Sequence, residues 1–92
     1  MFKNMNAVET INKLSYSEQK AVNALFTDDR TSFEVVTSKV ADNIGMSRSV
    51  IVNGLNKLNV TGMIESCSLG GKGTHIRVID PEFIGAVKAL EV

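Results

Sequence analysis

The stretch TSKVADNIGMSRSVIVNGLNKL, which runs from Thr37 to Leu58, decides the fold of this chain of 92 residues. It predicts two short helices separated by a tight turn. Gly45 can enter the left-handed conformation that ends a helix, and Ser47 is a favourable N-cap for a helix that begins at Arg48. Apolar residues recur in both helices at the spacing of one buried face. The pattern indicates a helix-turn-helix within residues 37–58.

The same spacing predicts which side chains of this motif face inward. They are Val40, Ala41 and Ile44 in the first helix, Met46 in the turn, and Ile51, Leu55 and Leu58 in the second helix. Thr37 or Ser38 is expected to cap the first helix, because a side-chain oxygen there can accept a hydrogen bond from an unpaired backbone N–H. Gly54 costs a helix about 1 kcal/mol relative to alanine, so we expect a close contact with another helix at this position.

Two more helices are predicted on the N-terminal side of the motif. Within residues 1–14 every third position is apolar, which predicts a helix. These apolar residues are Phe2, Met5, Val8, Ile11 and Leu14. Ser15 and Glu18 form the S-x-x-E pattern of a capping box, so a second helix begins there after a bend. β-branched and aromatic side chains at residues 33–36 predict a short strand.

A hairpin and a last helix are predicted on the C-terminal side. Within residues 63–79 apolar and polar side chains alternate around a glycine-rich turn, which predicts two strands, 63–69 and 74–79. The alternation places Ile64, Ile76 and Val78 inward, and Glu65, Cys67, His75 and Arg77 outward. Asp80-Pro81 is a typical helix start and predicts a helix over residues 81–91. The order of elements is that of a winged helix-turn-helix domain, mainly α with a small β-hairpin.

Composition and charge narrow the functional class. The formal net charge is zero, and 43% of the residues are hydrophobic, without any apolar run of the length that spans a membrane. The single cysteine allows no internal disulfide, which fits a cytoplasmic location. Residues 37–78 hold five basic and two acidic residues, giving +3, whereas residues 1–36 and 79–92 carry −1 and −2. The positive charge therefore lies in the segment that holds the predicted helix-turn-helix and hairpin, where it can attract a polyanion.

Candidate contacts to double-stranded DNA follow from the helix-turn-helix, whose second helix enters the major groove with its N-terminal turn leading. The candidates are Ser47, Arg48, Ser49, Val52, Asn53 and Asn56 on that helix, Lys39 on the preceding helix, and Lys72 and Arg77 on the wing. Arg48 can bind guanine through two hydrogen bonds, and Asn53 or Asn56 can read adenine. Lys72 offers a charge to a phosphate. The alternative reading is that these are ordinary solvated surface residues.

Other site chemistries find less support. The loop Gly70–Gly73 differs from a nucleotide-binding loop, because Lys72 is followed by glycine and a strand instead of Ser/Thr and a helix. Cys67 and His75 can approach across the hairpin, but a structural zinc normally takes four ligands. No nucleophile and base occur in motif spacing, so we predict no enzyme, no metal and no cofactor in this chain. A protein-interaction or dimerisation module on the same fold is the alternative function.

The residues also carry a family resemblance. The segments LSYSE (14–18), SRSVIVN (47–53) and IESCSLGGKGT (64–74) resemble the DNA-binding part of the CodY regulators of low-GC Gram-positive bacteria. The resemblance extends from about Leu14 to Ile79, and it implies that residues 15–92 are the winged helix-turn-helix domain and residues 1–14 the end of a linker helix. It also implies that the helix-turn-helix spans residues 37–56 and that the family's DNA-contacting pair falls on Arg48 and Ser49.

The resemblance implies a nutrient-responsive transcriptional regulator, mainly a repressor. Such proteins sense GTP and branched-chain amino acids through a GAF domain, which this chain has no room for, and the full-length regulator is expected to be a homodimer. At the positions of Asn56 and Cys67 the family usually carries basic residues. We therefore expect weaker attraction to phosphates in this chain.

Overall fold

The computed structural model describes residues 6–26, 30–70 and 73–90. The described elements follow the predicted order. They are α1 (Ala7–Asn12), α2 (Tyr16–Leu25), β1 (Ser32–Val35), α3 (Thr37–Ile44), α4 (Arg48–Val60), β2 (Ile64–Ser68), β3 (Thr74–Val78) and α5 (Phe83–Lys88). None of the described helices is long and apolar enough to cross a membrane.

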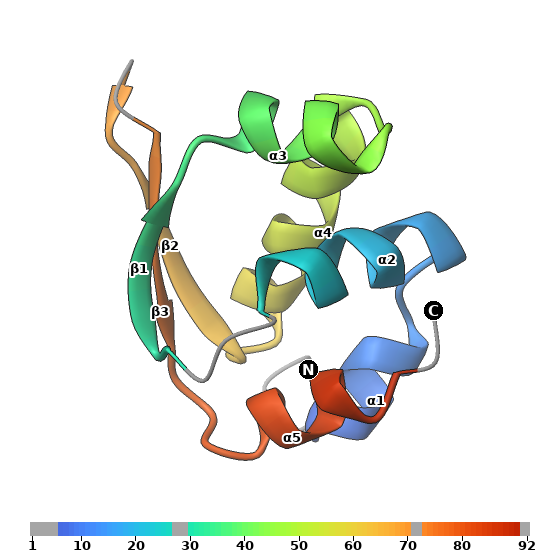
Figure 1. Ribbon diagram of the computed structural model, residues 1–92. Helices are drawn as coiled ribbons and strands as arrows, with labels where there is room; N and C mark the ends of the chain where they lie inside the picture. Colours follow the sequence, from blue (N-terminus) through green and yellow to red (C-terminus); the bar gives the residue numbers. More distant parts are fainter. Residues whose placement is uncertain (1–5, 27–29, 71–72, 91–92) are drawn as a thin grey trace.

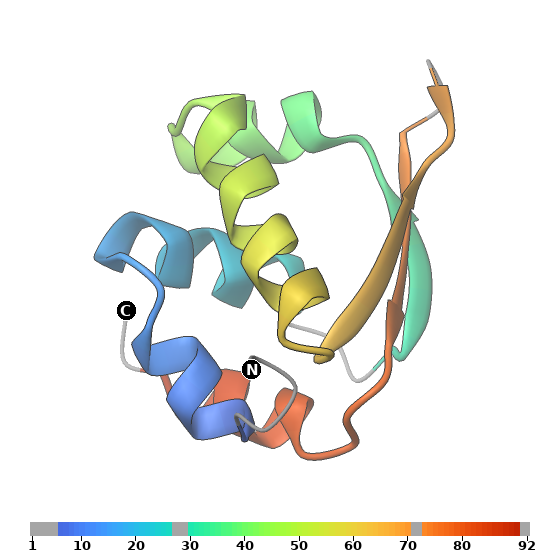
Figure 2. The same cartoon turned by 180° about the vertical axis from the view of Figure 1, so that it is seen from behind.

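The helices pack on one face of a small antiparallel sheet (Figures 1 and 2). The strand order is β1-β3-β2, so the short strand before the helix-turn-helix pairs with the far edge of the hairpin. Phe33 lies opposite Ile76, and Cys67 lies opposite His75. The starts of α3 and α4 and the tip of the hairpin lie at one end of the molecule, whereas α1 and α5 lie together at the other.

The core joins the helices to the inner face of the sheet. Phe26 lies at its centre, because its ring meets Phe33 at 5.5 Å and Phe83 at 4.9 Å, both edge to face. The predicted inward residues Ile51, Leu55, Leu58, Ile64 and Ile76 are buried, whereas Val78 is half-buried against the core. In α3, Ala41 is buried while Val40 and Ile44 are half-buried against the core.

The apolar stripe predicted for the N-terminal helix is wrong at Val8, whose exposed fraction is 59%. Ile11 and Leu14 are buried as predicted, and Ala7 and Thr10 are buried in place of Val8. Phe2 and Met5 lie outside the described residues. A step of three residues drifts around a helix, and the six residues of α1 offer only one narrow face to the core. Thr10 is accommodated in that face because its hydroxyl donates to the carbonyl oxygen of Asn6 at 2.9 Å.

The predicted helix caps are confirmed in part. Ser15 and Glu18 form the expected capping box, and Gly45 ends α3 with a φ of 71°. The cap predicted at Thr37 or Ser38 is wrong, because α3 begins at Thr37 and its N-cap residue, Val36, has no side-chain oxygen to offer. The last helix begins at Phe83 and not at residue 81. Asp80 instead stabilises the turn before it, where its Oδ1 accepts from the backbone N–H of Glu82 at 2.9 Å.

Gly54 faces α2, as the sequence predicted, but the contact leaves room for a side chain. A Cβ at this position would lie 3.7 Å from Glu18 Cβ and 3.7 Å from Val22 Cγ2, which is ordinary van der Waals contact. We expect Gly54→Ala to raise the free energy of unfolding by about 0.5–1 kcal/mol, since alanine loses less backbone entropy in a helix. Urea denaturation of the two proteins measures the difference.

Gly45→Ala is the matched control for that variant. A Cβ at Gly45 would meet no atom within 4 Å, so it would cause no overlap either, but the φ of 71° is strained for alanine. We expect a loss of roughly 1 kcal/mol at Gly45. A loss of stability at Gly54 would show that the helices need their close approach there.

Glu18 and Lys57 join α2 to α4 through an ion pair in which Glu18 Oε1 lies 2.8 Å from Lys57 Nζ. The Glu18 side chain is only 8% exposed. Burial raises the pKa of this carboxyl, but the hydrogen bond from Lys57 and the backbone N–H of Ser15 outweigh burial, so that the pKa lies below its ordinary value of 4.5. The ionised form is therefore the one that the fold stabilises.

This pKa predicts a pH dependence of stability. A carboxyl whose pKa is lower in the folded state stabilises the fold above pH 4.5, and that contribution is lost as the pH falls through the folded-state pKa. Glu18→Gln keeps an oxygen for the capping box and removes the charge. We expect it to cost about 1–2 kcal/mol near neutral pH and progressively less below pH 4.5, as measured by chemical denaturation across pH.

Glu9→Gln is the control, since Glu9 forms the capping box of α1 on an exposed surface. A cost for Glu18→Gln that does not change with pH would contradict an electrostatic role.

Candidate nucleic-acid interface

The first turn of α4 is presented to solvent at the end of the molecule that also holds the hairpin tip (Figures 1 and 2). Ser47 is the N-cap residue, as predicted, but its hydroxyl makes no cap and instead lies 3.0 Å from Ser49 Oγ. Arg48, Ser49 and Asn53 are exposed. A short turn, set by Gly45, therefore leaves the leading end of α4 uncovered by the rest of the fold.

Arg48 is held by the preceding helix. Its Nε donates to Thr37 Oγ1 at 3.3 Å, and Thr37 is buried, with an exposed fraction of 8%. Within the described residues, the two terminal nitrogens of Arg48 have no hydrogen-bond partner. The guanidinium is thus fixed at one nitrogen and available for ligand at the others.

A polar groove separates α4 from the hairpin. One part, of about 290 Å³, lies between Val52, Asn56 and Asn59 of α4 and Ser66, Ser68 and Thr74 of the hairpin. A second part, of about 210 Å³, continues to the start of α3 and the hairpin end. Thr37 and Arg48 line both parts. The inner face of the sheet is apolar around Ile64 and Ile76 and polar around Ser66, Ser68 and Thr74. Because burying unpaired polar groups is costly, the helix and the hairpin do not pack tightly against each other there.

Asn59 ties the hairpin to α4 and was not found by reading the sequence. Its Oδ1 accepts from the backbone N–H of Ser66 at 2.9 Å, and its Nδ2 donates to Ser66 Oγ. Nothing in the local sequence distinguishes this asparagine from Asn53 or Asn56, because the contact depends on how the sheet packs against the helix. The side chain fixes the position of the wing relative to the leading turn of α4.

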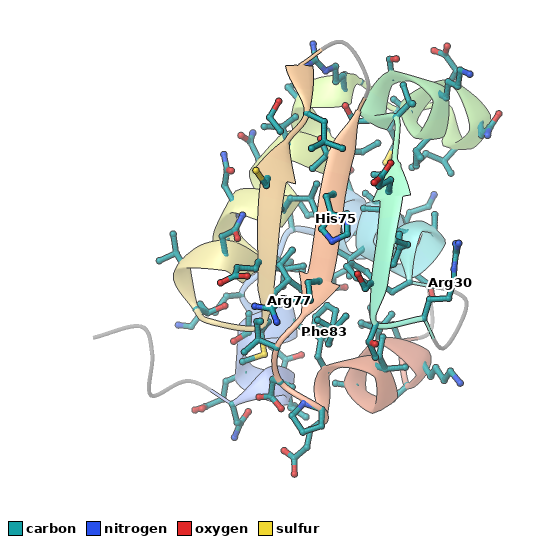
Figure 3. The ribbon with its side chains drawn as sticks, turned by 90° about the vertical axis from the view of Figure 1, so that its left-hand side faces the viewer. Arg30, His75, Arg77 and Phe83 are labelled. Atoms are coloured by element: carbon teal, nitrogen blue, oxygen red, sulfur yellow. The ribbon has the colours of Figure 1, made fainter. Side chains whose placement is uncertain are left out.

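The predicted DNA-contacting residues that the structure describes lie in two separate regions, the helix-turn-helix and the outer face of the sheet. The six on α4 and its cap lie along one exposed side of that helix, with Val52 half-buried and Asn56 exposed beside the groove. Lys39 is exposed on α3. Arg77 lies on the outer face of the sheet, away from α4, where its Nη2 donates to Glu65 Oε1 at 2.7 Å (Figure 3). Lys72 lies outside the described residues.

Local charge is more concentrated than the sequence suggested. Of the described basic residues between 37 and 78, Lys57 and Arg77 are paired with carboxylates. Lys39 and Arg48 have no such partner in the part of the chain that the structure describes. Among the described basic residues of this segment, these two cations on the helix-turn-helix therefore remain to attract a phosphate.

The outer face of the sheet carries a row of polar side chains, of which Figure 3 labels His75 and Arg77. His75 lies with Nε2 3.2 Å from Ser32 Oγ and Nδ1 3.8 Å from Glu34 Oε2, and Cys67 is exposed opposite it on β2. A thiol, an imidazole and a carboxylate are the groups that some acyl-transfer enzymes use. The Glu34 side chain is 63% exposed, however, so these groups lie in water and not in an enclosed site. No group of three or more metal-ligating side chains occurs among the described residues.

The exposed leading turn of α4, the tight turn before it and the hairpin fixed beside it define a winged helix-turn-helix domain. The family model of the CodY helix-turn-helix domain matches residues 34–91. The chain therefore belongs to the CodY helix-turn-helix domain family, which is a family of DNA-binding domains and not of enzymes.

Curated relatives agree with this assignment. The chain is 47% identical over 83 residues to the global transcriptional regulator CodY of Lysinibacillus sphaericus, and 48% identical over 82 residues to those of Geobacillus kaustophilus and Clostridium botulinum. These alignments cover 88–89% of this chain but 32% of each relative. The chain thus spans about a third of the length of the relatives it matches.

Proposed function

We propose that this chain is the double-stranded-DNA-binding domain of a nutrient-responsive bacterial transcriptional regulator that acts mainly as a repressor. The observation that carries the proposal is Arg48, which stands on the exposed leading turn of α4 with its terminal nitrogens unoccupied within the described residues. A cation in this position on a helix-turn-helix faces the major groove when the helix docks.

The proposed mode of binding follows from the geometry of the site. The first turn of α4 enters the major groove, where Arg48 donates two hydrogen bonds to guanine and Asn53 or Asn56 pairs with adenine. The hairpin, tied to α4 through Asn59, meets the neighbouring backbone. Ser47, Ser49 and Lys39 contribute hydrogen bonds and charge to phosphates.

The regulatory part of the proposal rests on the relatives, whose printed name is global transcriptional regulator. GTP and branched-chain amino acids would bind a GAF domain outside this chain. The winged helix-turn-helix domain itself would hold no cofactor. A homodimeric regulator in the cytoplasm would place two copies of α4 on two half-sites, which compensates for the small contact area of one module.

A selection from random duplexes tests the proposal. The 92-residue chain is incubated with the library at low salt, and the retained DNA is sequenced after several rounds. We expect a short motif to be enriched, and anisotropy titrations to show tighter binding to the selected duplex than to a shuffled duplex of the same composition. If no motif is enriched and no binding occurs at tens of micromolar protein, even non-specific attraction is absent and the proposal fails.

A protein-interaction module is the second candidate, and one observation favours it. An apolar groove of about 210 Å³ lies between α1 and α5, lined by Val8, Ile11, Ala86 and Leu90 among others. A docking function would leave DNA binding undetectable and make self-association or partner binding sensitive to Val8→Asp. Sedimentation of the wild-type chain and of this variant separates the two functions.

A further inference from the structure

Thr37 has a feature that helix formation does not explain. It is the first residue of α3 and is buried, yet its hydroxyl caps no backbone N–H of that helix. The hydroxyl instead accepts a hydrogen bond from Arg48 Nε on the next helix at 3.3 Å. The contact joins residues 11 positions apart, so it exists only because the turn brings the two helix starts together.

The hydrogen bond engages Nε, which an end-on bidentate contact through the two terminal nitrogens does not use. The two terminal nitrogens form the fork that matches a guanine edge or a phosphate, and in the described part of the chain both remain without a partner. Fixing Nε removes rotational freedom from a long side chain before DNA arrives, which lowers the entropy that binding must oppose. Thr37 and Arg48 also line both parts of the groove beside α4, so the fork is fixed at the edge of the interface.

We propose that Thr37 is a positioning residue that orients Arg48 for sequence-specific recognition, without contacting a base itself. The inference rests on the proposed DNA-binding function. An oriented fork favours the duplex with a guanine at the correct position, whereas non-specific binding depends on charge and tolerates many orientations. Loss of the Thr37 hydroxyl should therefore lower specific affinity selectively.

Two substitutions of Thr37 separate the effect of its hydroxyl from the effect of its packing. Thr37→Val keeps the shape and removes the acceptor, whereas Thr37→Ser keeps the acceptor and removes a methyl group. We expect Thr37→Val to bind the selected duplex about 5- to 20-fold more weakly and the shuffled duplex as the wild type does, because preorganisation affects only the oriented contact. Thr37→Ser should restore most of the specific affinity. Thermal unfolding of each variant shows whether the fold is intact.

A double-mutant cycle with Arg48→Ala gives the sharpest result. If Thr37 acts through Arg48, then Thr37→Val causes no further loss in the Arg48→Ala background. An equal loss in both backgrounds, equal weakening on both duplexes, or a loss for Thr37→Ser as large as that for Thr37→Val would overturn the inference.

A measurement without DNA tests the contact between Thr37 and Arg48 separately from the proposed function. The Arg48 side-chain Nε–H proton should give a separate NMR signal whose exchange with water is slower than that of an unbonded arginine, and Thr37→Val should accelerate this exchange. Fast exchange in the wild-type chain contradicts the positioning contact even if Thr37→Val fails to fold. Failure of the selection to return any motif contradicts the DNA-binding function instead.

Discussion

Arg48→Ala is expected to abolish the preference of the chain for its selected duplex while leaving the fold intact. Arg48 is exposed, so its removal opens no cavity. One bidentate contact to a base discriminates by about 1–3 kcal/mol, which corresponds to a loss of roughly 5- to 150-fold in specific affinity. Anisotropy titrations on the selected and shuffled duplexes measure the loss, and circular dichroism verifies the fold.

Arg77→Ala is the matched control, because it removes the same side chain from the outer face of the sheet. Arg77 is paired with Glu65 and points away from α4, so we expect specific affinity to change by less than about twofold. Lys72→Ala offers a second comparison, in which a lost phosphate contact weakens both duplexes alike and lowers the salt slope by about one. Equal losses in Arg48→Ala and Arg77→Ala would place recognition elsewhere.

Gly73→Ala is expected to be the most damaging alanine substitution among the glycines that the structure describes. Gly73 has a φ of 109°, and a Cβ there would overlap the backbone carbonyl oxygen of Val35 and lie 3.2 Å from its carbonyl carbon. Backbone atoms of β1 cannot move aside as a side chain could. The strained φ and the overlap together should lower the free energy of unfolding by about 2 kcal/mol or more. Urea denaturation measures this loss.

The damage should be local to the junction between β1 and the hairpin. Hydrogen exchange in Gly73→Ala is expected to lose protection first along the β1–β3 pairing, at residues such as Phe33 and Ile76. Gly70→Ala is the comparison within the same loop, because its φ of 67° is also strained but a Cβ there would meet no atom within 4 Å. Equal stability of the two variants would show that the overlap with Val35 is relieved without cost.

Most of the fold could be predicted from the sequence because its signals are local. The αL position of Gly45, the capping box at Ser15 and the alternation around Ile76 depend on neighbours within a few residues, and the structure confirms each of them. The family resemblance is confirmed as well, since the CodY helix-turn-helix model covers residues 34–91. Short elements were harder: α1 has too few residues for its periodicity to identify the buried face.

The relations between elements could not be predicted. Reading the sequence placed Thr37 as a cap, and only the packing of α3 on α4 shows that its hydroxyl accepts from Arg48. Asn59 and Ser66 meet for the same reason. The pairing of Arg77 with Glu65 could have been predicted. A hairpin that joins 63–69 to 74–79 in this register sets the two residues opposite each other on the outward face.

NMR mapping of the DNA contacts locates the recognition surface on the chain. Backbone amide signals of the 92-residue chain are recorded while the selected duplex is added. We expect the largest shift changes at residues 47–56 and along the hairpin end of β2 and β3, and we expect the side-chain Nε–H signal of Arg48 to shift as well. Shift changes confined to α1 and α5 would contradict a recognition surface on α4. So would a titration in which no backbone signal and no Arg48 side-chain signal shifts.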